Sequence, residues 1–389
     1  MAGAAVAGAV VDRRPPPAAG RFECGLAAPS DDAAIAALLA ATSLPGEIRL
    51  SFERAPSPLA AGSIDGDVHQ WLVARDRCTG ALAGVASRAE RAVFVNGRPG
   101  RVGYLSQLRL DPACRQLRAV ITAGLASCRG LHDRGDVPFH LLSVVAGGDR
   151  TRRLVATARA GTAPRLIRLA TLRTFALTTH VGPPRREEAG LRIEAGHDAA
   201  MAEIVACLER HQPRFQLASR WAAADFRSDR TRGLQPTDFV VARRGARVVG
   251  CLASWDQRAF RQVVVRGYSR RLRLLRPGLN AVAPWIGLPH LPAVGEPLAF
   301  AYLSHVAVDD DDPAVFAALV RAQCRRARAA GLSHVVVAFV PGHPLFAAVP
   351  AIARHRAYDS DLFAAAWDGD VDAVAALDGR ALHPEVALL

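Results

Sequence analysis

Two arginines lie between a predicted strand and a predicted helix, a position that suits binding of a phosphate group. The apolar run over 103–110 predicts a buried strand that ends at Pro112, because proline cannot donate to a sheet ladder. Arg115 and Arg118 come next, and residues 119–130 have apolar positions at helical spacing. Free amides and the positive dipole end of a helix N-terminus attract anions. The stretch therefore predicts a phosphate-binding turn.

The strand before this turn occurs a second time, and other segments repeat with it. Three early segments recur at offsets of 166 to 168 residues, whereas the strand recurs at 198. The nearly constant offset predicts two copies of one domain, and its jump places an insertion of about 31 residues in the second copy. The matched segments are 198–202 with 32–36, 240–243 with 72–75, 250–254 with 84–87, and Leu303 with Leu105.

Residues 110–120 resemble the acetyl-CoA motif of the GNAT N-acetyltransferase superfamily. Arg115 matches the first residue of the Arg/Gln-x-x-Gly-x-Gly/Ala signature, whereas Arg118 and Val120 replace its two small residues, so the motif is degenerate. The resemblance implies an α/β (α+β) fold of two tandem GNAT-like domains, each a mixed twisted sheet flanked by helices. It also implies an acetyl-CoA-dependent N-acetyltransferase that moves an acyl group from CoA to a primary amine of a small molecule or peptide.

The same resemblance assigns the parts of acetyl-CoA, which is a co-substrate here, to particular residues. It gives the pantetheine arm and thioester to the backbone of Leu108, Arg109 and Leu110. No metal is expected. The residues assigned to the pyrophosphate are Arg115, Gln116, Leu117, Arg118, Ala119 and Val120.

The second copy has four consecutive aspartates, 309–312, where this basic turn should be. Carboxylates suit a helix N-terminus but repel a pyrophosphate, so we expect CoA in the first domain only. Consecutive aspartates cannot all converge on one ion, and an N-cap cluster is the favoured interpretation over a metal site.

The sequence leaves the catalytic acid and base unknown. Ser106 and Gln107 stand where many relatives of the family have a carboxylate, and the region of the family's tyrosine, around residue 155, has none. Glu90 and His305 are weak candidates for the base. A solvated carboxylate and a packed core histidine are their structural alternatives, and a water chain to solvent is another route for the proton.

The domain boundaries follow from the repeat. We expect a 44–67 loop bounding the acceptor site, and a basic helix over 149–160. The insertion has a basic amphipathic pattern that suits a membrane, a polyanion or the other domain, and packing on its own domain is favoured over these. The expected units are a flexible leader 1–20, the GNAT-like domain 21–180, a linker 181–190, the degenerate domain 191–368 with the basic insertion 262–294, and a C-terminal tail 369–389.

Composition narrows the class of protein further. The chain of 389 residues carries 49 basic residues, all arginine, and a net charge of +13. The absence of lysine points to coding bias, so no nucleic-acid partner is expected. Seven scattered cysteines without metal spacing and no long apolar run predict a cytoplasmic protein without a transmembrane segment. A catalytically inactive GNAT-fold protein that binds CoA or a partner is the alternative to an enzyme.

Overall fold

The computed structural model describes residues 20–145, 162–182, 190–286 and 290–389. The expected basic helix over 149–160 lies outside the described residues, as do residues 1–19 of the expected leader and 183–189 of the expected linker. We call residues 20–182 the first half and residues 190–368 the second half.

The two halves share one core order of elements, and each adds further elements to it. The first half contains β1 (Phe22–Leu26), α1 (Asp32–Ala41), β2 (Ser43–Leu44), β3 (Ile48–Glu53), α2 (Pro58–Ala61), β4 (Val68–Asp76), β5 (Leu82–Val95), β6 (Arg98–Leu110), α3 (Leu117–His132), β7 (His140–Val145) and β8 (Arg165–Thr178). The second contains β9 (Leu191–Ala195), α5 (Met201–His211), β10 (Phe239–Arg244), β11 (Arg247–Trp255), β12 (Gln262–Tyr268), α6 (Arg270–Ile286), β13 (Phe300–Val308), α7 (Pro313–Ala329), β14 (His334–Phe339) and β15 (His355–Ala366).

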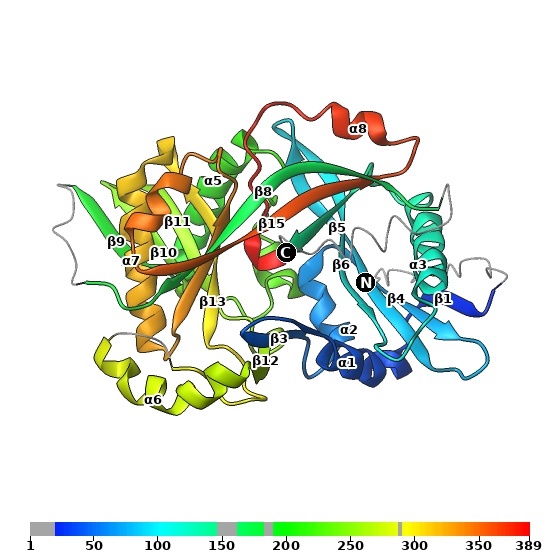
Figure 1. Cartoon of the computed structure of the whole chain (residues 1–389). Coiled ribbons are helices and arrows are strands. Elements are labelled where there is room, and N and C mark those ends of the chain that lie inside the picture. Colours follow the sequence, from blue (N-terminus) through cyan, green and yellow to red (C-terminus); the bar gives the residue numbers. More distant parts are fainter. Residues whose placement is uncertain (1–19, 146–161, 183–189, 287–289) are drawn as a thin grey trace, which may run out of the picture.

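Twelve of these strands form one continuous sheet, in the order β1-β4-β5-β6-β7-β15-β8-β14-β13-β11-β10-β9. The last strands of the halves exchange places at its centre: β15 pairs with β7 of the first half, and β8 pairs with β14 of the second. In Figure 1 both strands cross the middle of the molecule. Each half therefore completes the sheet of the other, which ties the halves together through backbone hydrogen bonds.

Helices cover both faces of each half, which explains why the strands are apolar without strict alternation. In β10, Val240 and Ala242 pack with α7, whereas Phe239 and Val241 pack with α5 on the opposite face. The first half is built in the same way. There Trp71 packs with α1, and α3 lies on the opposite face.

A second, smaller sheet joins the halves on one side, in the order β12-β3-β2. Its strand β3 belongs to the segment 44–67, so the expectation of a loop there was wrong. Its strand β12 opens the insertion 262–294, so the insertion pairs with the first half rather than packing on its own domain alone. Six register pairs, from Gln262–Glu53 to Tyr268–Ile48, make this contact. Residues 48–53 alternate between apolar and polar side chains as a strand does, but this pattern does not identify β12, which lies more than 200 residues away, as the partner of β3.

The residues expected as a C-terminal tail begin with a short helix, α8 (Val371–Ala375), and end between the two halves. Val386, Ala387 and Leu388 are buried. The Arg91 guanidinium on β5 donates to the Leu388 carbonyl, and Arg261 of the second half donates to the Ala387 carbonyl at 2.9 Å. We call residues 381–389 the C-terminal segment. It contacts both halves where they meet.

Candidate functional site

The first half opens where β6 and β7 separate. These parallel strands pair only at Gly103–His140 and Tyr104–Leu141, although β6 continues to Leu110 and β7 to Val145. Residues 105–110 thus have no ladder partner on the β7 side, and their side chains are only partly buried. Backbone groups on this edge of β6 thus have no partner on β7, and the Leu108 carbonyl accepts from the Arg109 guanidinium at 2.9 Å.

A bulge lies in the middle of the exposed edge. Ser87 and Val85 of β5 are opposite Ser106 and Arg109, so β6 has one more residue than β5 between these two pairs. Gln107, within that step, has a left-handed backbone with φ of 54°. It has no register partner on either neighbouring strand. Gln107 therefore lies outside the regular ladder.

The predicted phosphate-binding turn follows directly. Helix α3 begins at Leu117, and its N-cap residue, Gln116, makes no side-chain hydrogen bond to the helix amides. The first turn contains no carboxylate, and both Arg115 and Arg118 are exposed. The free amides, the helix dipole and two guanidinium groups make this end of α3 suited to an anion. The structure thus brings residues 108–120 together as a strand end, a turn and an uncapped helix.

The second half has the same bulge but no opening. His305 has a φ of 55° and sits 198 residues after Gln107, at the equivalent step between Ser304 and Ala307. Residues 303–308 of β13 are each at most 3% exposed. The bulged amide of His305 donates to Glu385 Oε2 of the C-terminal segment at 2.9 Å. A carboxylate oxygen therefore occupies the place that the first half leaves free.

The aspartates at the start of α7 close the second half further. Asp312 caps the helix by accepting from the amides of Ala314 and Val315, as the sequence predicted. Two of the other three acids pair with arginines: Asp309 with Arg210 and Arg247, and Asp311 with Arg214. These contacts neutralise the cluster within the protein. Among the described residues, no three His, Cys, Asp or Glu side chains gather as a metal site would require.

Neither candidate base is placed to take a proton in the first half. Burial, and then the Arg230 guanidinium, lower the pKa of His305 to about 3, and its ring lies 4.3 Å from the ring of Trp221 inside the second half. Glu90 is 7% exposed on β5. Its carboxylate is paired with Arg88 at 2.7 Å and Arg101 at 3.3 Å, so it is held as an ion-pair partner.

Sequence reasoning missed the bulge and the role of Glu385. Alignment of the repeats at an offset of 198 pairs Gln107 with His305, which is the one signal that the two positions are equivalent. Burial raises the pKa of the Glu385 carboxyl to about 7, even though two backbone amides donate to it. A glutamate in this C-terminal stretch carries no local sign of that contact.

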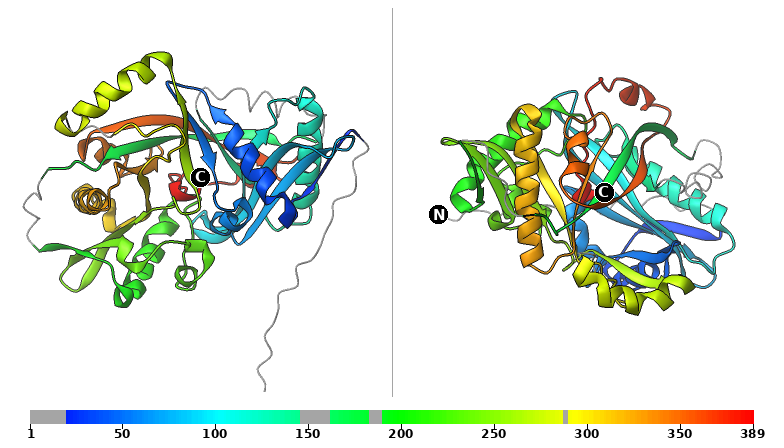
Figure 2. Two further views of the ribbon diagram at one scale, coloured as in Figure 1. Left: turned by 90° about the horizontal axis from the view of Figure 1, so that it is seen from below. Right: turned by 60° about the vertical axis from the view of Figure 1, so that its left-hand side comes forward.

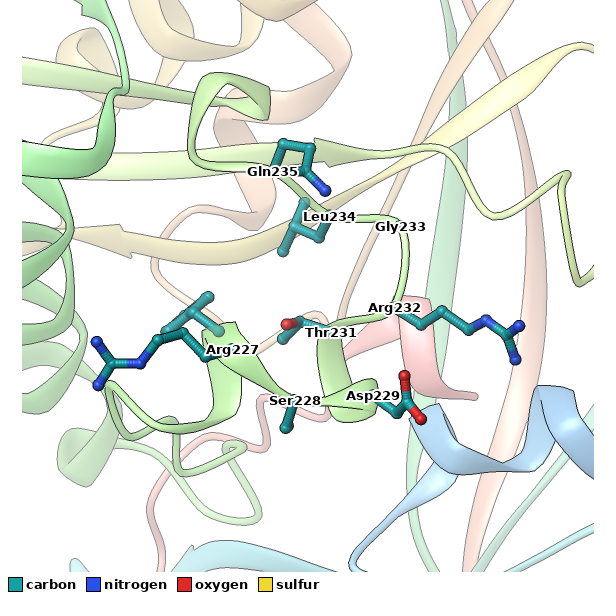
Figure 3. A pocket seen from close by; sticks show the side chains of 9 residues that line it. Arg227, Ser228, Asp229, Thr231, Arg232, Gly233, Leu234 and Gln235 are labelled. Atoms are coloured by element: carbon teal, nitrogen blue, oxygen red, sulfur yellow. The ribbon is translucent and has the colours of Figure 1, made fainter.

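A further hollow, of about 480 Å3, lies at the loop 226–235 of the second half (Figure 3). Arg227 and Arg232 extend from it in opposite directions, so they do not converge on one ligand. The Arg232 guanidinium instead donates to the Ala60 carbonyl of the first half at 3.0 Å. The loop therefore serves the contact between the halves.

The structure resembles solved acyltransferases at low sequence identity. It matches the GCN5-related glucosamine N-acetyltransferase region of a fungal multi-domain GH3 beta-N-acetylglucosaminidase with a TM-score of 0.57 and 14% identity, over 90% of this chain. The chain spans 38% of that protein's chain. It matches Saccharomyces cerevisiae N-myristoyltransferase with bound myristoyl-CoA and inhibitors with a TM-score of 0.56 and 13% identity, over 91% of this chain and 82% of that one.

A GCN5-related N-acetyltransferase from Sphaerobacter thermophilus matches over 89% of this chain and 96% of its own, with a TM-score of 0.52 and 14% identity. No protein-family model matches the sequence, and neither does a curated protein. The repeated halves, the paired bulges and these structural likenesses confirm the expected fold. The chain has a tandem form of the fold of the GNAT superfamily.

Proposed function

We propose that this protein is an acyl-CoA-dependent N-acyltransferase with one acyl-CoA site, in the first half. The observation that carries the proposal is the difference between the two bulged amides. In the second half the His305 amide holds a carboxylate oxygen at 2.9 Å. In the first half the equivalent Gln107 amide lies on a partly exposed strand edge. A thioester carbonyl oxygen gains negative charge during the reaction and is stabilised by a hydrogen-bond donor that is already in position. We propose that the Gln107 amide is this donor.

The rest of the opening suits the rest of the ligand. The backbone of Leu108, Arg109 and Leu110 follows the bulge along the free edge of β6 and can pair with the amides of a pantetheine arm. Residues 115–120 form the basic, uncapped start of α3, where a pyrophosphate is favoured. The edge of β6 thus offers backbone groups to the pantetheine arm, and the basic start of α3 follows it where the pyrophosphate of acyl-CoA would lie.

The reaction is the transfer of an acyl group, with acetyl as the group we propose, to a primary amine. The amine nitrogen bonds to the thioester carbonyl carbon, the carbon–sulfur bond breaks, and the amine proton leaves while the sulfur gains one. Because Glu90 is held in ion pairs and His305 is buried in the other half, neither is proposed as the base. The proton leaves through water, which favours an acceptor amine that is uncharged near neutral pH.

Isothermal titration with acetyl-CoA tests the site. We expect one equivalent per chain. We also expect Arg115→Glu to weaken binding about tenfold or more, because it places a carboxylate at the helix N-terminus. Arg98→Glu is the matched control, since it makes the same charge change at an exposed arginine at the start of β6. Asp310→Arg, in the second half, should leave binding unchanged. Two equivalents of ligand, or none, would contradict the proposal.

A protein that binds acyl-CoA without turnover is the second candidate, and the missing base favours it. Release of free CoA thiol, measured with a panel of primary amines, separates the two. Thiol release that needs the amine and falls with Arg115→Glu supports the enzyme. Tight binding without release for any amine leaves a CoA-binding protein.

A further inference from the structure

Helix α6 of the insertion presents an apolar face to solvent. Ala283 is buried and Leu272 and Arg276 are partly buried, which defines the side toward the protein. At 100° per residue the opposite side is centred on Leu274 and Trp285. Those two side chains are 79% and 88% exposed. In a helix packed on a core the apolar side faces the protein, whereas in α6 an apolar side faces solvent.

The apolar face is large for a single helix. Of the eleven large hydrophobic side chains that are exposed among the described residues, five lie on α6. They are Leu274, Leu275, Leu279, Val282 and Trp285; Leu279 borders the side toward the protein, and the other four form the outward face. Helix α6 lies along the outer edge of the molecule in all three views, below the small sheet in Figure 1 (Figures 1 and 2). Exposed apolar surface gathered in this way marks a place of contact with another body.

Positive charge surrounds the same face. The guanidinium groups of Arg270, Arg271 and Arg273 have no hydrogen-bond or ion-pair partner among the described residues, and no Asp or Glu occurs between Asp256 and Glu296. Arg276 is used within the protein: its Nε donates to the Leu291 carbonyl at 3.0 Å. The first turn of the helix is therefore strongly basic and without a counter-charge on its own element.

The helix is held in place by its flanks. The side chain of Asn280 makes two hydrogen bonds to the backbone of Leu291, at 2.8 and 3.0 Å. The Tyr268 hydroxyl donates to the Pro292 carbonyl at 2.6 Å, and the preceding β12 pairs with β3. The apolar face is thus presented on an ordered element, and docking needs no folding of α6.

We propose that α6 docks this protein on the surface of an anionic lipid bilayer. An exposed face of Leu, Val and Trp flanked by arginines matches the two layers of such a surface, since the apolar groups enter the acyl boundary while guanidinium groups meet phosphates. A second copy of the chain fits less well, because two such helices would bring their arginines together. A nucleic acid would use the arginines and leave the apolar face in water. This inference is independent of the proposed enzyme activity.

Trp285 provides a direct readout. The other four tryptophans, Trp71, Trp221, Trp255 and Trp367, are each at most 3% exposed. We expect the full-length protein to sediment with vesicles of phosphatidylcholine and phosphatidylglycerol but not with phosphatidylcholine alone. Its fluorescence should shift to the blue, and brominated lipids should quench the signal of Trp285. Binding should weaken as salt is added.

Two double variants test the two parts of the surface. Arg270→Glu with Arg271→Glu, and Leu274→Ser with Val282→Ser, should each weaken vesicle binding by about tenfold or more. The matched controls are Arg98→Glu with Arg134→Glu, and Leu44→Ser with Val68→Ser, which change exposed residues of the first half and should leave binding intact.

Several outcomes would overturn the proposal. Equal binding to neutral vesicles, retained binding in either α6 variant, or an unchanged Trp285 signal would each rule out docking through this face. A concentration-dependent dimer that is lost in the Leu274→Ser, Val282→Ser variant would assign the face to a second copy of the chain instead.

Discussion

Gln107 and His305 have the same backbone conformation at equivalent places in the two halves, yet the His305 amide donates to a carboxyl group of the C-terminal segment whereas Gln107 lies on a partly exposed strand edge. Their φ angles are 54° and 55°. Gln107 lies in a bulge of β6 and His305 in a bulge of β13, the strands that pair in parallel with β7 and β14. Glu385 Oε2 accepts from the His305 amide. One fold thus contains an open and an internally occupied copy of the same oxygen-binding geometry.

The left-handed backbone at Gln107 makes this position sensitive to side-chain shape. Gln107→Val should lower the free energy of unfolding by about 1–2 kcal/mol more than Gln107→Gly, because a β-branched residue is strained at positive φ whereas glycine is not. Urea unfolding measures the difference. Leu108→Val, one residue further along β6, is the control and should show little strain. Equal stability of the Val and Gly variants would mean that the bulge is not formed in solution.

Glu385 should make stability depend on pH. Its folded pKa of about 7 lies above the ordinary value of 4.5, so the folded state holds the proton more tightly than the unfolded state. That contribution is complete below about pH 4.5 and is lost as the pH rises through 7. As the pH rises from about 4.5 to 7, the free energy of unfolding of Glu385→Gln should therefore increase by roughly 2–3 kcal/mol relative to that of the wild type. Thermal or urea unfolding at several pH values checks this.

The control for Glu385 is Glu209→Gln, which changes an exposed carboxylate on α5 and should shift the free energy of unfolding by less than about 0.5 kcal/mol. If the difference between wild type and Glu385→Gln is the same at all pH values, the carboxyl is not buried as described.

Glu90 can be tested as a structural partner rather than a base. Glu90→Gln should destabilise the protein by roughly 3 kcal/mol, because it leaves the buried Arg88 guanidinium without its counter-charge. Asp67→Asn, which removes a more exposed partner of Arg101, should cost about 1 kcal/mol or less. Unchanged stability together with a hundredfold loss of kcat would instead make Glu90 the base.

His305 should contribute little to turnover. It is fully buried in the second half, and its pKa of about 3 leaves it neutral throughout the working range. His305→Gln should lower kcat/KM by less than about tenfold, against the ~10²–10⁴ expected when a general base is removed. The pH profile of kcat/KM for both proteins decides the point. A limb near pH 6–7 that disappears in the variant, with a hundredfold loss, would identify His305 as the base.

Much of the architecture was readable from the sequence because its signals are local. The strand over 103–110, its end at Pro112 and the helix after Arg115 follow from apolar spacing and from residues that stop a ladder. The repeat at constant offset predicted that the elements of the first half recur later in the chain, since equivalent strands and helices need equivalent patterns. The cap at Asp312 was predicted on the same local grounds.

The tertiary structure alone decided which parts of the two halves meet. The exchange of β8 and β15 and the pairing of β3 with β12 join residues more than 150 positions apart, and a strand's own pattern does not identify its partner. The same holds for Glu385 and the His305 amide, 80 residues apart. The sequence by itself determined the repeated elements and the basic turn. Folding determined which of the two bulged amides is filled, because that depends on where the C-terminal segment comes to lie.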